Sequence, residues 1–186
     1  MEIIVPDSMA DITVKQYKAI ADLNVKEGST EWLTEAVGIF CNLTPDVVAK
    51  LTVAELESIS KIVQRINDPE QNNQELQTKI EHKGKRYGFH PNLSKLTVGE
   101  FADLETYCAG GFFDNINEIM GILYRPIKTE GGSFYTIEEY TGDVFPNHWD
   151  DLKMDVVLGA TNFFLSTGVT LTTALANSLT EGGTGT

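Results

Sequence analysis

The sequence predicts an α+β protein that is mainly α, with about six to seven helices packed like a bundle and one small β-hairpin. Three observations lead to this prediction. A helix-start signature occurs three times, apolar residues recur at helical spacing through much of the chain, and one pair of short alternating segments flanks a Lys-Gly turn. Helices are therefore expected to supply most of the core.

The repeated signature has the form Thr-Val-x-Gln/Glu and starts at Thr13, Thr52 and Thr97. A threonine at the N-cap accepts a hydrogen bond from the amide three residues on, and the Gln or Glu there returns one from the N–H of the cap. The copies are unevenly spaced and the sequences between them do not match. We interpret them as helix starts, with a degenerate helical duplication as the alternative.

Four helices are expected in the first third of the chain, each capped by a threonine. They begin after Thr13, after Thr30 (Glu31 to Cys41), after Thr44 with Pro45 as the first helical residue, and after Thr52, the last ending at about Ile66. Asn67-Asp68-Pro69 ends the last of them. The polar residues 69–75 read as a linker. The chain is expected to form one domain over 1–180, or two lobes at 1–68 (helical) and 76–180 (hairpin plus helices).

The second half begins with the hairpin, whose strands are expected at 77–82 and 85–90 on either side of Lys83-Gly84. Further elements are a helix from Thr97 to Tyr107, a helix capped by Asp114 or Asn115 that stops before Pro126, a weaker strand or turn at 133–140, and a helix over about 150–179. Residues 181–186 form a flexible tail.

The chain carries a net charge of −13 at pH 7. Phosphate backbones and anionic membranes would be repelled by most of such a surface, so neither nucleic acid nor a membrane is an expected partner. Residues 156–179 lack charge, but their Asn, Ser and Thr content favours a helix buried by protein over a bilayer span. Cys41 and Cys108 read as buried free thiols, and the N-terminus lacks signal-peptide features, which favours the cytoplasm.

Three groups of residues were weighed as chemical sites. His148, Asp150, Asp151 and Asp155 offer metal ligands, but acidic residues in a first helical turn are favoured by the helix dipole alone. Cys108 with His90 or His82 contains the residue types of a nucleophile and a base, with nothing in the sequence to position them.

The third group is the set of hairpin bases Lys79, Lys83, Lys85 and Arg86. It is interpreted as a solvated strand edge, with an acidic protein partner or nucleic acid as alternatives. Phosphate loops, zinc-protease motifs and nucleophile elbows do not occur. We therefore expect a non-enzymatic protein without metal or cofactor.

The order of motifs resembles small phage tail assembly chaperones. The resemblance is carried by the Thr13 helix, then Phe40-Cys41-Asn42-Leu43-Thr44-Pro45, then Val48 and Leu51-Thr52-Val53-Ala54-Glu55-Leu56. The second half is similar to uncharacterised proteins of tailed phages, through the residues 88–93, 123–127 and 137–142. Many relatives of the first-half pattern are shorter and lack the hairpin.

The resemblance implies a protein without catalytic residues that binds the tape measure protein, or another tail protein, and keeps its long helices soluble in the host cytoplasm during tail morphogenesis. Phe163, Phe164, Val169 and Leu171 on the uncharged last helix are the candidate partner contacts. The same helix would also serve homo-oligomerisation. Alternatives are a structural or adaptor protein of the virion and a small enzyme of unrecognised type.

Overall fold

A computed structural model describes residues 3–66, 74–132, 134–143 and 147–181. For residues 63, 65, 66 and 168–181 it describes the backbone and not the side chains. The chain separates into two compact units. Unit 1 comprises Met1–Gln74 and Asn147–Val157, and unit 2 comprises Glu75–Pro146 and Leu158–Thr186.

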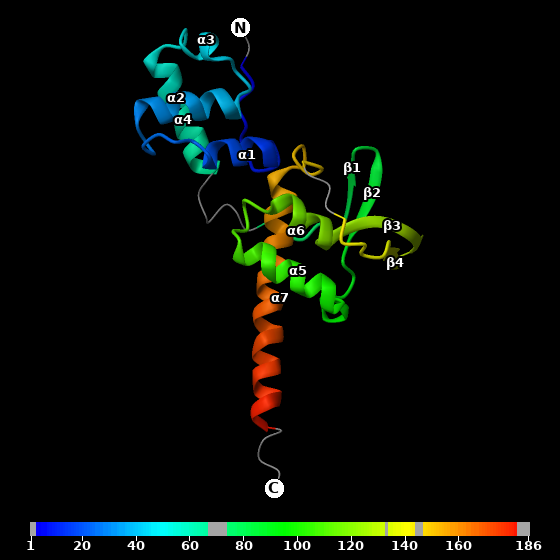
Figure 1. Cartoon of the computed structure of the whole chain (residues 1–186). Coiled ribbons are helices and arrows are strands. Elements are labelled where there is room, and N and C mark those ends of the chain that lie inside the picture. The colour runs from blue at the N-terminus through cyan, green and yellow to red at the C-terminus, as the bar shows by residue number, and fades with distance from the viewer. Residues whose placement is uncertain (1–2, 67–73, 133, 144–146, 182–186) are drawn as a thin grey trace. The chain divides into compact units, whose positions relative to one another are not determined.

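Unit 1 is helical (Figure 1). Its elements are α1 (Val14–Ala21), α2 (Thr30–Phe40), α3 (Pro45–Val48), α4 (Val53–Ile66) and the first residues of α7 (Met154–Glu181). Helix α2 is the centre of the packing, because it contacts α1, α3 and α4. The core is built from the buried side chains Met9, Ile12, Val14, Ala36, Val37, Phe40, Val48, Ile59, Trp149, Leu152 and Met154.

Two segments far apart in the sequence are joined by backbone hydrogen bonds within unit 1. The N–H of Val14 donates to the carbonyl of Leu152 at 2.9 Å, and the N–H of Met154 donates to the carbonyl of Ile12 at 2.9 Å. Thr13 and Lys153 thereby form an isolated antiparallel bridge. The residues just before α7 are thus fixed to the start of α1, a pairing that the local sequence does not signal.

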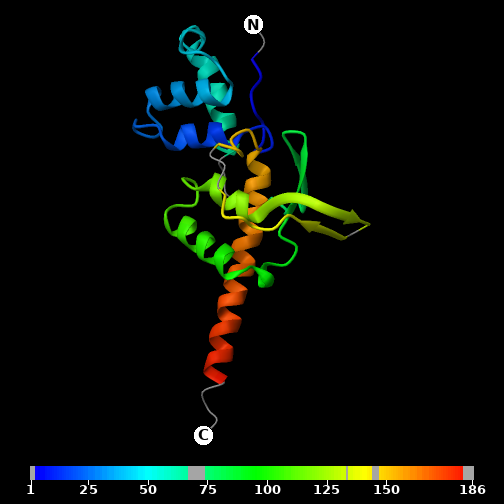
Figure 2. The same ribbon diagram turned by 45° about the vertical axis from the view of Figure 1, so that its right-hand side comes forward.

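Unit 2 contains a four-stranded antiparallel sheet in the order β1-β2-β3-β4. The strands are β1 (Lys79–His82), β2 (Lys85–Phe89), β3 (Tyr124–Gly131) and β4 (Phe134–Ile137). The other elements are the 3₁₀ turn η2 (Leu93–Lys95), α5 (Val98–Ala109), α6 (Ile116–Leu123) and α7 from Leu158 onward. The β1–β2 and β3–β4 hairpins point in different directions in both views, so the sheet is strongly twisted (Figures 1 and 2).

Helix α6 contributes more buried apolar side chains to the core of unit 2 than any other described element. Ile116, Ile119, Met120, Ile122 and Leu123 are all at most 1% exposed. The helix passes directly into β3, so that Tyr124 is both the helix C-cap and the first strand residue. The position of the apolar face of α6 is therefore linked directly to the position of the start of β3.

The α+β class is confirmed, because the described residues form seven α-helices and a four-stranded sheet, with 47% helix and 15% strand. A mainly α, bundle-like architecture is not confirmed. The difference lies in β3, because the sequence predicted only a loop through Gly131-Gly132 between the helix that stops before Pro126 and the segment 133–140. In the structure Pro126 is paired opposite Tyr87 and accepts a hydrogen bond from the N–H of Glu138 at 2.9 Å.

The helix starts at Thr13, Thr52 and Thr97 are confirmed, each with its reciprocal capping box. The expected cap at Thr30 is wrong. The N-cap of α2 is Ser29, whose hydroxyl accepts from the N–H of Trp32 at 3.1 Å. Ser29 has the extended backbone of a cap, whereas Thr30 is already the first helical residue.

The proposed linker at 69–75 falls mostly outside the described residues, as does the tail after 181. Within the part of the chain that is described, no helix combines the length and the apolar character that crossing a membrane requires.

A close backbone approach in unit 2 provides a stability test. Gly159 of α7 is buried, and a Cβ at this position would lie 2.3 Å from the carbonyl oxygen of Glu75. We expect Gly159→Ala to lower the free energy of unfolding by about 1–3 kcal/mol, because the clash is with backbone that has no rotamer to change. Denaturant unfolding of the purified chain measures the change.

Gly99 in α5 is the matched control, because a Cβ there meets nothing within 4 Å. Gly99→Ala should raise stability by about 0.5–1 kcal/mol, since alanine is the better helix former. Equal effects of the two substitutions would contradict the close approach of α7 to Glu75.

Candidate partner-binding surfaces

The predicted contact residues on α7 differ in their surroundings. Phe163 is 41% exposed, whereas Phe164 is half-buried. The side chains of Val169 and Leu171 lie outside the described residues. Leu165, which the sequence analysis did not select, is 55% exposed and is the more accessible apolar side chain of this helix segment.

Phe163 also contributes to the packing of unit 2. Its ring meets the ring of Phe89 edge-on, with the centroids 5.6 Å apart, and Phe89 in turn packs edge-on against Tyr124 at 5.3 Å. Phe89 is 2% exposed, so this chain of rings connects α7 with the interior of β2 and β3. Phe163 therefore holds α7 in place, and Leu165 is the cleaner probe of surface binding.

The segment 148–155, weighed as a metal site, has a structural role in unit 1. The carbonyl of Asp150 accepts from the N–H of Lys15 at 2.9 Å, and the N–H of Asp155 donates to the carbonyl of Met9 at 3.3 Å. His148 packs edge-on against the ring of buried Trp149. In the described part of the chain, His, Cys, Asp and Glu side chains form no group of three or more that would hold a metal ion.

Cys108 and His90 occupy different environments. Cys108 is half-buried in α5, where burial raises the pKa of its thiol and so disfavours the reactive thiolate. His90 Nδ1 accepts from the N–H of Asn92, and its Nε2 faces Glu100 Oε1 at 3.9 Å. The structure therefore places His90 in a polar cluster with Asn92 and Glu100.

This cluster is the most buried set of charges in unit 2. Glu100, the third helical residue of α5, is 2% exposed. One carboxylate oxygen accepts from the N–H of Thr97 at 2.6 Å, and the other pairs with the guanidinium of Arg125 in β3 at 2.7 Å. The capping box that the sequence predicts is thus also a buried ion pair between α5 and the sheet.

The environment of the cluster determines its titration. Burial acts to raise the pKa of Glu100, but the hydrogen bonds from Thr97 and the charge of Arg125 outweigh it, so the pKa is lowered. Burial and the positive charge of Arg125 lower the pKa of His90. Near neutral pH the cluster therefore holds an ionised Glu100 and a neutral His90.

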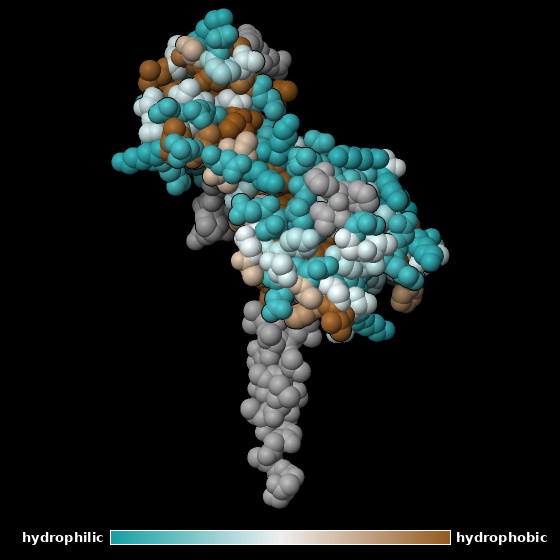
Figure 3. All heavy atoms as spheres, in the orientation of Figure 1, coloured by the Kyte–Doolittle hydropathy of each residue, from teal (hydrophilic) through white to brown (hydrophobic). Residues whose placement is uncertain are grey.

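Three of the four basic residues of the β1–β2 hairpin have acidic partners in β3 or just after β4. Lys79 and Arg86 both pair with Glu130 of β3, and Lys85 lies 3.7 Å from Glu138. The face of unit 2 seen in Figure 3 is mostly hydrophilic, with small separate hydrophobic spots. The hairpin thus presents partly neutralised charge, which weakens its interpretation as a docking surface for an acidic partner.

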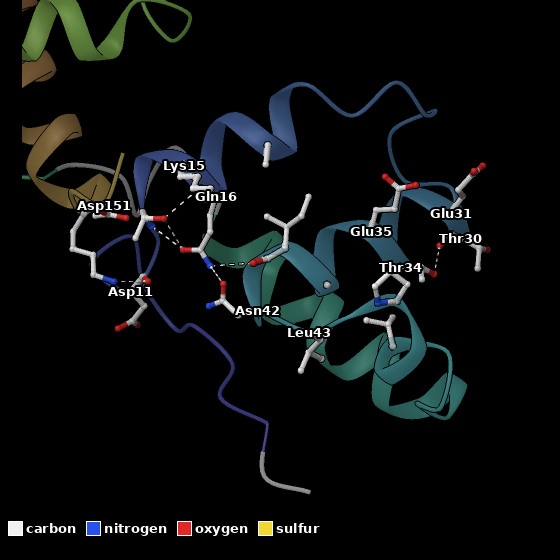
Figure 4. A pocket seen from close by; sticks show the side chains of 17 residues that line it. Asp11, Lys15, Gln16, Thr30, Glu31, Thr34, Glu35, Asn42, Leu43 and Asp151 are labelled. Carbon is white, nitrogen blue, oxygen red and sulfur yellow. Dashed lines mark hydrogen bonds between the residues drawn. The ribbon is translucent and has the colours of Figure 1, made fainter. Parts of the chain in front are cut away.

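Unit 1 contains a groove that the sequence analysis did not anticipate. Its volume is about 1030 Å³, and it lies along α1 and α2 (Figure 4). Its apolar lining comes from Ala19, Ile39, Leu43, Pro45 and Val48, and its charged lining from Asp11, Lys15, Glu31, Glu35, Asp151 and Lys153. Sequence alone does not reveal it, because the lining residues come from three separate stretches of the chain, 11–19, 30–48 and 151–153.

No family profile, curated protein or solved structure matches this chain.

The Glu100–Arg125 pair is expected to dominate the stability of unit 2. Replacing Glu100 with Gln keeps a capping side chain but leaves the buried guanidinium without a counter-charge, which should cost about 3–5 kcal/mol in denaturant unfolding. Glu55→Gln is the control, because Glu55 has the same position in its capping box but is exposed. A loss at Glu55 as large as that at Glu100 would contradict the special role of the buried pair.

Stability should fall on acidification. The unfolded chain takes up a proton at His90 near its ordinary pKa of 6.5, whereas folded His90 resists protonation, so stability is complete above that pKa and declines below it. The lowered pKa of Glu100 adds a second loss as the pH falls below its ordinary value of 4.5. Unfolding curves between about pH 7.5 and 5 measure the first part.

His90→Asn tests the assignment, since asparagine retains a hydrogen-bond acceptor for Asn92 but does not titrate. The variant should show a shallower decline of stability between about pH 6.5 and 5.5 than the unaltered chain. Identical slopes would exclude His90 as the titrating group.

Proposed function

We propose that this chain is a non-enzymatic tail assembly chaperone, which binds the tape measure protein of a tailed phage during tail morphogenesis. The motif order from the Thr13 helix to Leu56 supports the family, and the exposed apolar side chains of α7 support a protein-binding role. The single observation that carries the binding role is the 55% exposure of Leu165 on a helix segment without charge. A segment without charged side chains can be covered by a partner without the cost of desolvating a charge.

The proposed contact surface is centred on Leu165 of α7, with the exposed polar side chains of Asn162 and Ser166 beside it. Phe163 points to another side of the helix, where it packs on Phe89. An apolar side chain framed by uncharged polar ones suits the apolar face of an amphipathic helix. The tape measure protein is a long helical protein that must stay soluble before assembly, and it would supply such a face.

The net charge of −13 supports the same role. A chaperone that covers apolar helices must itself remain soluble in the complex, and a strongly charged frame provides mutual repulsion between complexes. The charge also favours partners with basic segments over nucleic acid or anionic lipid. Host cytoplasm is the compartment that this proposal implies.

A virion structural or adaptor protein is the second candidate, because an uncovered apolar helix would also serve permanent packing between subunits. The two roles differ in the mature particle. A structural protein is present in purified virions in fixed proportion to other tail proteins, whereas an assembly chaperone is absent.

Co-expression tests the chaperone role. Expressed with the tape measure protein of its phage, the unaltered chain should keep that protein soluble and co-purify with it. Leu165→Lys should reduce the co-purified amount about tenfold, because a lysine would be buried without a counter-charge in an apolar contact.

Val98→Lys provides the control, since Val98 is 88% exposed on α5 and lies outside the proposed surface. This variant should co-purify like the unaltered chain. An insoluble tape measure protein beside the unaltered chain would overturn the chaperone proposal, and equal losses for both variants would overturn the role of α7.

A further inference from the structure

We propose that the groove of unit 1 is a second binding site, which takes an amphipathic helix with lysine or arginine at one end. It lies in a different unit from the α7 surface and does not depend on the tape measure protein being the partner. Three features of the groove define the ligand: unpaired carboxylates at one end, an apolar floor, and balanced charge at the other end.

The first feature is the pair Glu31 and Glu35. They are one helical turn apart on α2, both line the groove, and both are exposed. Neither carboxylate has an ion-pair partner among the described residues. Like charges at this spacing repel and weaken the helix that carries them. An external cation between them would convert that repulsion into attraction.

The floor of the groove is apolar. Ile39 and Leu43 are half-buried, and Val48 is buried. A helix inserts side chains from successive turns into such a floor, at positions i, i+3 or i+4, and i+7. A groove of about 1030 Å³ is large enough for several of these side chains.

The opposite end carries no net charge. Figure 4 shows Asp11, Lys15 and Asp151 at the end away from Glu31 and Glu35. Lys15 and Lys153 offset the two aspartates, and the ammonium of Lys153 also donates to the carbonyl of Asp11 at 2.9 Å. The uneven charge gives the groove a direction, because a cationic residue is attracted to the Glu31 and Glu35 end alone.

Binding of model peptides to the full chain tests this proposal. The probes are three synthetic helical peptides of equal length with leucines at i, i+3, i+4 and i+7. One carries lysines at one end, the second carries glutamates in their place, and the third is a scrambled lysine peptide. Fluorescence anisotropy should show binding of the lysine peptide that weakens with salt, and binding at least about tenfold weaker for the other two.

The double variant Glu31→Lys/Glu35→Lys should weaken binding of the lysine peptide about tenfold or more. Glu57→Lys/Glu105→Lys is the matched control, because it changes the net charge equally at exposed acidic residues of α4 and α5 outside the groove. The control should bind within about twofold of the unaltered chain, which separates local pairing from the overall negative field.

Equal binding of the lysine and glutamate peptides, equal losses in the two double variants, or no binding of any peptide would each overturn the proposal. Circular dichroism of every variant verifies that the total helix content is unchanged. Leu165→Lys should bind the lysine peptide normally, so a failure of the groove and a failure of the α7 surface are distinguishable.

Discussion

The carboxylate of Glu100 is the interaction on which unit 2 most depends. One of its oxygens closes the first turn of α5, and the other neutralises Arg125 at the start of β3. Because β3 continues directly from α6, this single side chain ties the N-terminus of α5 to the segment that also carries the core of the unit. Breaking it would expose a buried guanidinium whose Nε already lacks a hydrogen-bond partner in the described structure.

The same capping position is used differently in each of its three copies. Gln16 closes the box at Thr13 and donates from its amide to the carbonyls of Ile39 and Phe40, which are the last residues of α2. Among the described residues Glu55 bonds to Thr52 alone, and its side chain stays at the surface. A motif that is identical in local chemistry thus fixes long-range packing in two cases and only a helix start in the third.

The three copies show which features the sequence could predict and which it could not. Capping boxes, the Lys83-Gly84 turn and the stop before Pro126 are local, and the structure contains all of them. The partner of Glu100 is 25 residues away and the partner of Thr13 is 140 residues away, so no local pattern reveals either. Strand β3 was missed for a related reason, since its pairing with β2 outweighs the local penalty of a proline.

The candidate binding surfaces differ in whether their charged side chains already have partners within the fold. On the hairpin, Lys79, Lys85 and Arg86 are paired with Glu130 or Glu138, so these three bases have less charge to offer an acidic partner. On α2, by contrast, Glu31 and Glu35 are unremarkable in an acidic sequence and yet have no ion-pair partner among the described residues. Unpaired like charges beside an apolar groove destabilise the fold slightly and become favourable when a ligand of opposite charge binds. The groove of unit 1 is therefore a better candidate than the hairpin for binding a charged partner.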